Sequence, residues 1–257
     1  MVTVAKPYDL NGDGKPDLIW RHSTNGNTYF WYMNGNVLAS DAFFGSVPPS
    51  WEIVGVADFN GDGKNDVVWR NTANGDLYVW YLDNGVFVSD AFLGNVPPPW
   101  KIQGIADFNG DSKPDLLWRN ADSGSAFIWY MNNASFITDQ LLFNIDPVWK
   151  VEAIADLNFD GKPDLIFRNT VSGLSFVWYT TSTGNVTSLT TSAFIYGIDP
   201  VWQVVQTADY NGDGKPDFVF RNSSTGLVFV WYADGTTLQG SAFITQIDPV
   251  WEIAPRP

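Results

Sequence analysis

Five nine-residue segments of this chain carry oxygen-bearing side chains at their first, third, fifth and ninth positions, and four of the five have glycine at the sixth. In the second segment these residues are Asp58, Asn60, Asp62, Gly63 and Asp66. A tight turn that gathers alternate oxygens and one mid-loop carbonyl, closed by a carboxylate that binds through both oxygens, supplies the six or seven hard ligands that Ca2+ prefers. The spacing therefore predicts a cation site in each segment.

Position 7 is always a lysine, and we expect it to contribute its backbone carbonyl. The loop is not an EF-hand, because an aspartate closes it at position 9 instead of a glutamate at position 12. Two copies depart from the pattern, with Ser112 at position 6 and Phe159 at position 4, and we expect weaker sites there. The predicted ligands are Asp9, Asn11, Asp13, Lys15 and Asp17; Asp58, Asn60, Asp62, Lys64 and Asp66; Asp107, Asn109, Asp111, Lys113 and Asp115; Asp156, Asn158, Asp160, Lys162 and Asp164; and Asp209, Asn211, Asp213, Lys215 and Asp217.

The alternative is that Asp, Asn and Gly are simply the residues of which turns are made. Fifteen loop aspartates stand against five loop lysines, so each loop has a charge near −2 within a small volume. That repulsion costs on the order of several kcal/mol at moderate dielectric unless a cation neutralises it. Up to five Ca2+ would move the formal net charge of the chain from −14 to −4. We expect the cations to be structural and not catalytic.

The acidic segments belong to a longer repeat that fills the chain. Their starts lie 49, 49, 49 and 53 residues apart, and the four extra residues of the fourth unit fall in or near the polar stretch Thr180–Asn185. Self-similarity at such a period is typical of stacked repeats. We divide a single domain, 1–257, into units of approximately 2–50, 51–99, 100–148, 149–201 and 202–250, with 251–257 closing the ring.

Each unit reads as four short strands, because its apolar runs are β-branched or aromatic and are bounded by Gly, Asn, Asp and Pro. In the second unit the predicted strands are 52–57, 67–70, 77–82 and 86–92. A lone small sheet exposes both faces, whereas radial stacking buries them. The expected fold is all-β, a five-bladed β-propeller of four-stranded antiparallel blades with a Ca2+ loop in each blade.

The two ends of the chain complement each other. The first unit lacks the Trp that begins the others, and Trp251-Glu-Ile-Ala at the C-terminal end supplies it. An open solenoid would instead need dissimilar polar caps at its ends. We therefore expect Trp251 to pack at the seam between the last and first blades.

The composition disfavours some classes of partner and favours one cellular location. A net charge of −14 and a pI near 4.2 disfavour nucleic acid, and no run approaches the roughly 18 uninterrupted apolar residues of a membrane-spanning helix. The N-terminal residues lack the pattern of a secretory signal. The absence of cysteine, together with calcium loops, favours a secreted or cell-surface location, where millimolar calcium fills weak sites.

With these loops set between strands, the units resemble the FG-GAP or VCBS type of repeat. In integrin α-chain propellers and in many bacterial and fungal secreted proteins, such blades hold Ca2+ in an Asp-x-Asp/Asn-x-Asp-Gly-x-x-Asp loop, and the resemblance spans essentially the whole chain. It implies a propeller with one structural Ca2+ per blade. Some propellers of this type are lectins that hold sugars in grooves between blades, and others serve adhesion or decorate larger enzymes.

Two repeated elements are candidates for contact with a ligand. The first is an Arg-Asn pair at a strand end, which would donate hydrogen bonds to sugar hydroxyls: Arg21, Arg70, Arg119, Arg168 and Arg221, with Asn71, Asn120, Asn169 and Asn222. The alternative places each guanidinium between blades, stacked on aromatic rings and paired with an acid. The second is the indole that follows each Pro-containing linker, which either stacks on a sugar or wedges between sheets: Trp51, Trp100, Trp149, Trp202 and Trp251.

Catalysis finds little support. His22 is the only histidine, and asparagine replaces it in the other units, so nucleophilic triads and His-ligated zinc are disfavoured. Glu152 is the acid we would mutate first if hydrolysis were seen, because it is the least repeated one near the expected channel. We expect a non-enzymatic, multivalent, lectin-like module for a carbohydrate or glycoprotein surface. The alternatives are a protein-interaction scaffold with purely structural Ca2+ and, third, a five-bladed glycoside hydrolase.

Overall fold

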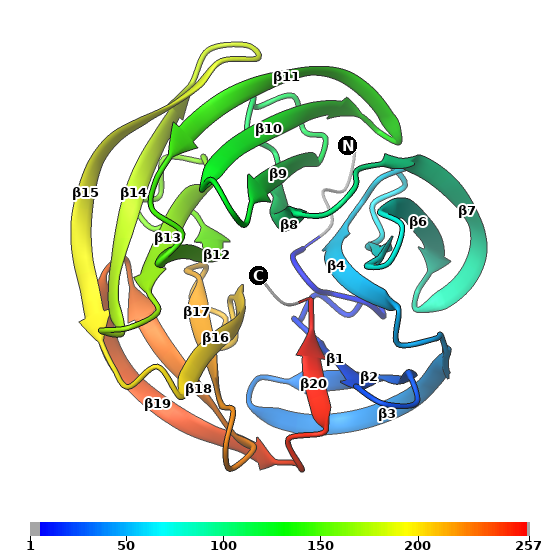
Figure 1. Ribbon diagram of the computed structural model, residues 1–257. Coiled ribbons are helices and arrows are strands. Elements are labelled where there is room, and N and C mark those ends of the chain that lie inside the picture. Colours follow the sequence, from blue (N-terminus) through cyan, green and yellow to red (C-terminus); the bar gives the residue numbers. More distant parts are fainter. Residues whose placement is uncertain (1–5, 256–257) are drawn as a thin grey trace.

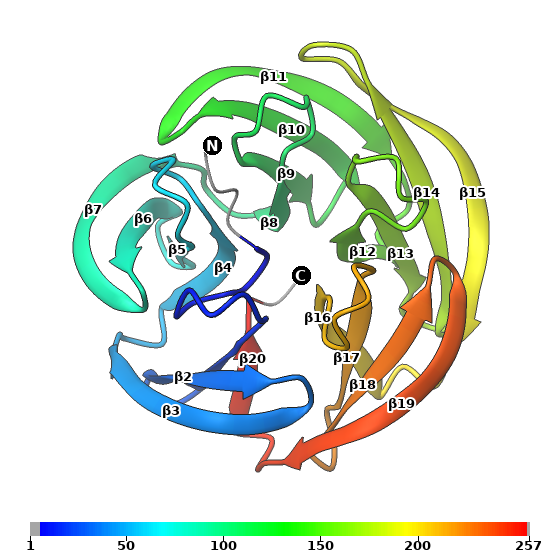
Figure 2. The same ribbon diagram turned by 180° about the vertical axis from the view of Figure 1, so that it is seen from behind.

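Residues 6–255 of the computed structural model are described, and they form five four-stranded antiparallel sheets arranged around a central axis (Figures 1 and 2). The predicted all-β, five-bladed propeller is thereby confirmed. These residues contain no helix, and hence no helix long and apolar enough to cross a membrane.

Within each blade the strands run outward from the axis in the order in which they are paired. The first blade contains β20 (Trp251–Ala254), β1 (Leu18–His22), β2 (Asn27–Asn34) and β3 (Val37–Ser46), and the second contains β4 (Trp51–Ala57), β5 (Asp66–Asn71), β6 (Asp76–Asp83) and β7 (Val86–Asn95). The third blade contains β8 (Trp100–Ala106), β9 (Asp115–Asn120), β10 (Ser125–Asn132) and β11 (Ser135–Asn144), and the fourth contains β12 (Trp149–Ala155), β13 (Asp164–Asn169), β14 (Leu174–Ser182) and β15 (Thr187–Gly197). The fifth blade contains β16 (Trp202–Ala208), β17 (Asp217–Asn222), β18 (Leu227–Asp234) and β19 (Thr237–Gln246).

The strands of the second blade match the predicted ones and extend one to three residues further at some ends. The extensions lie where ladder hydrogen bonds continue into the polar residues that flank each apolar run, such as Asp66 and Asn95. Side-chain patterning marks the buried part of a strand more sharply than its hydrogen-bonded ends.

The ring is closed by a strand from the C-terminal end of the chain. β20 pairs antiparallel with β1, joining Trp251 to His22 and Ile253 to Trp20 in register. The ring of Trp251 lies 4.8 Å from that of His22 and 5.7 Å from that of Tyr29. The expected position of Trp251 at the seam is thus the observed one, and the first blade combines residues from both ends of the sequence.

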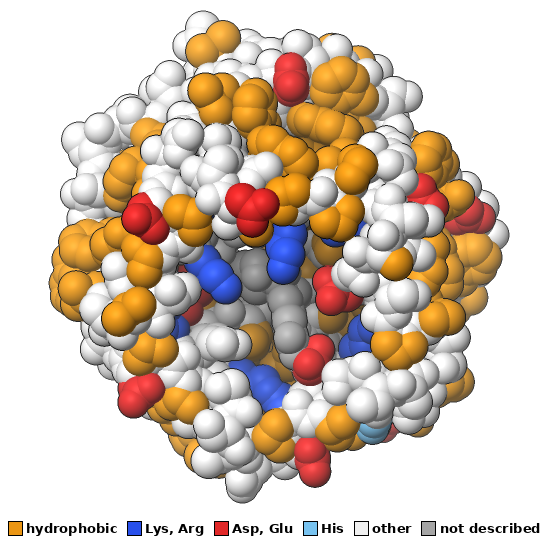
Figure 3. Space-filling view, in the orientation of Figure 1, with side chains coloured by type: hydrophobic (Ala, Val, Ile, Leu, Met, Phe, Trp, Pro, Cys, Tyr) orange, Lys and Arg blue, Asp and Glu red, His pale blue; other side chains and the backbone are white. Residues whose placement is uncertain are grey.

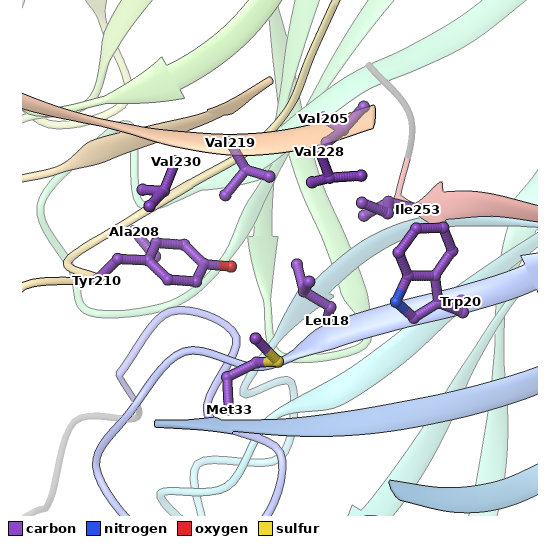
Figure 4. Packing of buried hydrophobic residues seen from close by; sticks show 10 residues of the cluster. All are labelled: Leu18, Trp20, Met33, Val205, Ala208, Tyr210, Val219, Val228, Val230 and Ile253. Carbon is purple, nitrogen blue, oxygen red and sulfur yellow. The ribbon is translucent and has the colours of Figure 1, made fainter. Parts of the chain in front are cut away.

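The hydrophobic core is divided into five clusters, one between each pair of neighbouring blades. Figure 4 shows the cluster at the closing interface, where Leu18, Trp20 and Met33 of the first blade face Val219 and Val230 of the fifth. Side-chain packing is thus the main contact between blades, and side-chain hydrogen bonds add to it, such as the one from Gln206 Nε2 to the Asp17 carbonyl at 2.9 Å. Because both faces of a blade are covered, consecutive residues of its second strand are buried.

The two ends of the ring differ in what they carry. In the second to fifth blades the acidic loop joins the innermost strand to the second, and in the first blade residues 9–17 precede β1, so all five loops lie at one end of the ring. The linkers between blades and the tryptophans that begin each innermost strand lie at the other end, which we call the linker face. Figure 3 views the ring in the orientation of Figure 1 and shows a hollow at its centre.

Candidate functional site

The first, third and fifth side chains of each acidic loop organise the loop backbone. In the second blade, Asp58 Oδ1 accepts the N–H groups of Gly61 at 2.7 Å and Asp62 at 3.2 Å, and its Oδ2 accepts that of Gly63 at 2.8 Å. Asn60 Oδ1 accepts the Asp62 N–H at 2.8 Å, and Asp62 Oδ1 accepts the Lys64 N–H at 2.9 Å. The carboxylates are thus gathered at one end of the blade by hydrogen bonds from the turn itself.

The ninth residue of each loop is placed differently. Asp66 is fully buried, and its two oxygens accept the backbone N–H groups of Phe59 at 2.9 Å and Leu82 at 3.0 Å. It thereby ties the loop to the third strand of its own blade. Burial raises the pKa of this carboxyl to about 7, while the two backbone hydrogen bonds act in the opposite direction. The same two bonds recur in every blade, made by Asp17, Asp115, Asp164 and Asp217.

The loop oxygens fit a hard cation by their chemistry. A carboxylate offers about four acceptor sites, so one bond to each oxygen of the ninth residue leaves capacity for a metal. Within residues 6–255, however, no group of three or more Asp, Glu, His or Cys side chains stands in metal-binding geometry. The residues that would hold Ca2+ are those predicted above, with positions 1, 3 and 5 exposed or partly exposed and position 9 buried.

The two divergent loops keep the same backbone path. Ser112 and Phe159 adopt positive φ angles of 65° and 62°, close to those of the glycines in the other loops, and a side chain is strained there. Ser112 still donates its N–H to Asp107 Oδ2 at 2.7 Å. In the fourth loop Asp156 Oδ1 accepts only the N–H of Asp160, since the bond that the fourth residue makes in the other blades is missing.

The repeated arginines are buried, 4–6% exposed, and pack between blades. Arg21 lies over the Trp69 ring of the next blade at 5.1 Å and donates to the carbonyls of Val47, Pro48 and Trp51 in the linker. Arg119 and Arg168 bind their own linkers in the same way. The geometry supports the stacking interpretation, with linker carbonyls in place of the expected acid as the main partners.

The asparagines that follow the arginines cap turns. Asn71 Oδ1 accepts the N–H groups of Ala73 at 2.9 Å and Asn74 at 3.3 Å, and Asn120, Asn169 and Asn222 make equivalent pairs. His22 does the same with Nδ1 toward Thr24 and Asn25, at 3.3 and 3.4 Å, which explains why histidine can replace asparagine in the first blade. Their carbonyl or ring acceptors are engaged within the protein.

The tryptophans that begin the innermost strands are partly exposed and take part in an aromatic stripe on each blade. Trp51 contacts Tyr78 edge-on at 5.8 Å, and Tyr78 contacts Phe92 at 5.1 Å on the outermost strand. Phe92 is 54% exposed, and its counterparts are 50–57% exposed. The five stripes are Trp251, Tyr29 and Phe43; Trp51, Tyr78 and Phe92; Trp100, Phe127 and Leu141; Trp149, Phe176 and Phe194; and Trp202, Phe229 and Phe243.

The outer members of these stripes were not predicted as ligand residues. The sequence feature that could have identified them is an Ala-Phe pair that recurs near the end of the fourth strand, as in Ala91-Phe92 and Ala242-Phe243. On a strand whose second face is covered, such a residue would be core. Because β7 is the edge of its sheet, Phe92 instead faces solvent.

Glu152 lies in a buried network at the boundary of the fourth and fifth blades. It is 7% exposed, pairs with Arg168 at 2.7 Å and accepts hydrogen bonds from Tyr196 Oη at 2.9 Å, Ser175 Oγ at 3.3 Å and the Val204 N–H at 3.1 Å. Because four donors surround its carboxylate, Glu152 forms a polar link between the fourth and fifth blades. Among residues 6–255, no second carboxylate hydrogen-bonds to the members of this network.

Comparison with known families assigns these repeats. Residues 9–69, 107–167 and 156–220 match the model of the FG-GAP-like repeat, which covers more than half of the chain. The protein therefore belongs to the FG-GAP-like repeat family. No curated protein matches the chain.

Several solved structures share the fold at low identity. An auxiliary nutrient binding protein from Bacteroides ovatus has a TM-score of 0.55 at 13% identity, and one from Bacteroides thetaiotaomicron has 0.53 at 13%. The match covers 94% of this chain and 56% of each of those proteins. The Tc holotoxin pore of Photorhabdus luminescens matches with a TM-score of 0.48 at 16% identity, over 90% of this chain and 12% of that one. The chain thus spans little more than half of the nutrient-binding proteins, and the likeness establishes the fold.

Proposed function

We propose that this protein is a non-enzymatic, calcium-stabilised propeller that binds carbohydrate, or a glycoprotein surface, through several equivalent sites outside the cell. The observation that carries the proposal is the aromatic stripe repeated on the linker face of every blade. Partly exposed aromatic rings present flat apolar surface to the C–H groups of a sugar, and large exposed apolar side chains in a soluble protein commonly mark interaction sites. The stripes end at the outer edge of the ring, so that five of them can meet one glycan surface.

Multivalency supplies the affinity. A single shallow sugar site binds weakly, but linked sites raise the overall avidity by about 10² to 10⁴ without any new contact when the geometry allows simultaneous engagement. The near-identical ring distances of 5.6 to 6.0 Å between tryptophan and second aromatic residue make the sites alike. A binding role agrees with the names of the two nutrient-binding proteins of similar fold.

In this proposal Ca2+ holds each acidic loop at the opposite end of the blade and does not touch the ligand. The observation in its favour is the clustering of like charges: burial is the main cause of the raised pKa of Asp66, and the nearby Asp58 and Asp62 raise it further. A bound cation would neutralise them. Chelation with EDTA should lower the melting temperature by many degrees, since a ligand of the folded state adds RT ln(1+[L]/Kd) per site.

The test of sugar binding is a glycan array combined with haemagglutination, with calcium kept constant. Phe92→Ser and Phe243→Ser together should reduce agglutination strongly, since they remove the exposed rings of two stripes. Val86→Ser is the matched control: Val86 is 66% exposed and stands at the opposite end of the strand that carries Phe92. Agglutination equal in both variants, or no glycan bound by the wild type, would reject the proposal.

A protein-interaction scaffold is the second candidate, and one observation favours it. The outer strand of the second blade exposes Val86, Phe87 and Val88, and the outer strand of the third blade exposes Phe136 and Ile137. Each of these side chains is 46–66% exposed. These residues lie at the acidic-loop end of the blades and are not part of the stripes. A scaffold should bind no glycan and should be unaffected by the Phe92 and Phe243 substitutions.

A further inference from the structure

A cavity of about 620 Å3 opens at the centre of the linker face, between the inner strands of the first three blades. Its lining includes Arg70 and Thr72 from the second blade, Trp100 and Lys101 from the third, and Glu52 from the start of β4. Figure 3 shows both blue and red side chains around the central hollow of this face. The volume suits a small ligand of one or two rings.

Arg70 lines this cavity with unused hydrogen-bonding capacity. It is 5% exposed, yet within the described residues it donates a single hydrogen bond, from Nη2 to the Val96 carbonyl at 2.7 Å, and its Nε is buried without an acceptor. The equivalent Arg21 donates five, one of them to the Thr28 hydroxyl at 3.1 Å. Leu77 takes the place of that threonine opposite Arg70 and offers no acceptor.

A buried guanidinium with unpaired N–H groups is costly unless an acceptor reaches it, and an anion is the strongest acceptor. Lys101 stands on the same cavity with its side chain exposed and adds a second cation. Arg21 is a third, against Glu52 and Glu252, so the charged groups that line the cavity sum to about +1. A chain of net charge −14 thus keeps a positive cavity at its centre.

The net charge of the cavity lining favours one class of anion over another. A monoanion such as a carboxylate matches a surplus of one positive charge, whereas a dianionic phosphate would be repelled by two glutamates in the lining. The Glu52 carboxylate and the Thr72 hydroxyl, which itself donates to the Ser50 carbonyl at 3.1 Å, can accept hydrogen bonds from sugar hydroxyls, and the partly exposed Trp100 presents a ring for stacking.

We infer that this cavity binds a carboxylate-bearing sugar, a uronate, with its carboxylate on Arg70 and Lys101 and its hydroxyls toward Glu52 and Thr72. The inference rests on the proposed function only for the sugar class, because the anion site depends on the arginine and the lysine and not on the aromatic stripes. A second cavity of about 570 Å3 lies between the inner strands of the fourth, fifth and first blades, and its charged lining also sums to about +1, from Lys150, Arg168 and Arg221 against Glu152 and Glu252. The proposed site differs from it in its arginine, because Arg168 already donates to Glu152 and to the linker carbonyls of Ile198 and Asp199. Lys101 corresponds to Glu52, Lys150, Gln203 and Glu252 in the other blades.

The test is isothermal titration of the purified protein with galacturonate, at constant calcium, with galactose as the neutral sugar and acetate as the bare carboxylate. Galacturonate should bind at least about tenfold more tightly than either, and its affinity should fall with added salt. Lys101→Gln should lower the affinity about tenfold and reduce the salt dependence. Lys150→Gln is the matched control, because Lys150 is equally exposed at the same register position one blade further.

Arg70→Lys tests the buried partner, since it keeps the charge but loses the forked donor geometry, and circular dichroism verifies its fold. It too should weaken the binding of galacturonate and leave that of galactose unaffected. Equal binding of the charged and neutral sugars, or equal losses in the Lys101 and Lys150 variants, would overturn the inference, and so would acetate binding as tightly as galacturonate. Loss of agglutination in the Phe92 and Phe243 double variant with galacturonate binding intact would separate the two proposals.

Discussion

Removing the carboxylate of Glu152 should destabilise the ring at the boundary between the fourth and fifth blades. Glu152→Val installs the residue that the second and fifth blades carry at this position, Val54 and Val205, so the new side chain is compatible with the strand. The variant deprives four donors of their shared acceptor: Arg168, Ser175, Tyr196 and the Val204 N–H.

The magnitude follows from these partners. Arg168 keeps the linker carbonyls of Ile198 and Asp199 at 3.0 Å each, as the arginines of other blades do, so its charge is not left alone. The buried Tyr196 hydroxyl and the Val204 N–H lose the acceptor to which they donate, whereas Ser175 can still donate to Tyr196 Oη. At about 1–3 kcal/mol for each buried donor left without a partner, the loss is about 3–5 kcal/mol. That corresponds to a fall in melting temperature of roughly 10 °C for a chain of this size.

Thermal and chemical denaturation followed by tryptophan fluorescence would measure the loss. Glu52→Gln is the control, because Glu52 is exposed and should change the melting temperature by less than about 2 °C. The triple variant Glu152→Val, Ser175→Ala, Tyr196→Phe removes both hydroxyls and should recover about 2 kcal/mol. If Glu152→Val were as stable as the wild type, or if the triple variant recovered nothing, the carboxylate would not be the link between these blades.

Three further predictions concern closure, turns and pH. A chain truncated before Trp251 loses the inner strand of the first blade and the contacts of Ile253, so it should unfold at a temperature more than about 10 °C lower, or aggregate, in a scanning fluorimetry assay. Asn71→Ala removes a turn cap and should cost about 1 kcal/mol in urea unfolding, without changing glycan binding. In EDTA, the raised pKa of Asp66, about 7 against an ordinary 3.8, means that the folded state holds a proton that the unfolded state releases. Its contribution to stability is then complete below about pH 4 and is lost as the pH rises through 7, so the melting temperature of the chelated protein should fall between pH 5 and pH 8, and a rise would contradict the assignment.

The sequence was sufficient to predict the architecture, because the same pattern of strands and turns occurs in five repeats. The strand positions and the closing role of Trp251 both follow from the side-chain pattern, and each is a local or register property. The partners of the arginines could not be predicted in the same way. Arg21 binds carbonyl groups, which every residue possesses, so nothing in the side-chain pattern identifies the acceptor.

The ninth residue of the acidic loop shows a similar limit. Its type and spacing predict a metal ligand, and that prediction stands for a test with calcium. The structure adds that Asp66 accepts an N–H group from Leu82, on a strand sixteen residues further along. A carboxylate can serve both purposes, and only the three-dimensional path of the chain reveals the second.

Residues that recur in all five blades and residues that differ between blades have different roles in this fold. The features shared by all five blades, such as the buried arginine, the turn cap and the buried aspartate, are engaged in holding the blades and their turns. The inner positions that differ from blade to blade, Glu52, Lys101, Lys150, Gln203 and Glu252, surround the axis on the linker face, where no packing requirement makes them alike. Under the two binding proposals, charge at these positions sets the specificity at the centre, and the stripes, which must stay alike to act together, supply avidity at the edge. The two properties are then expected to be separable by mutation in one molecule.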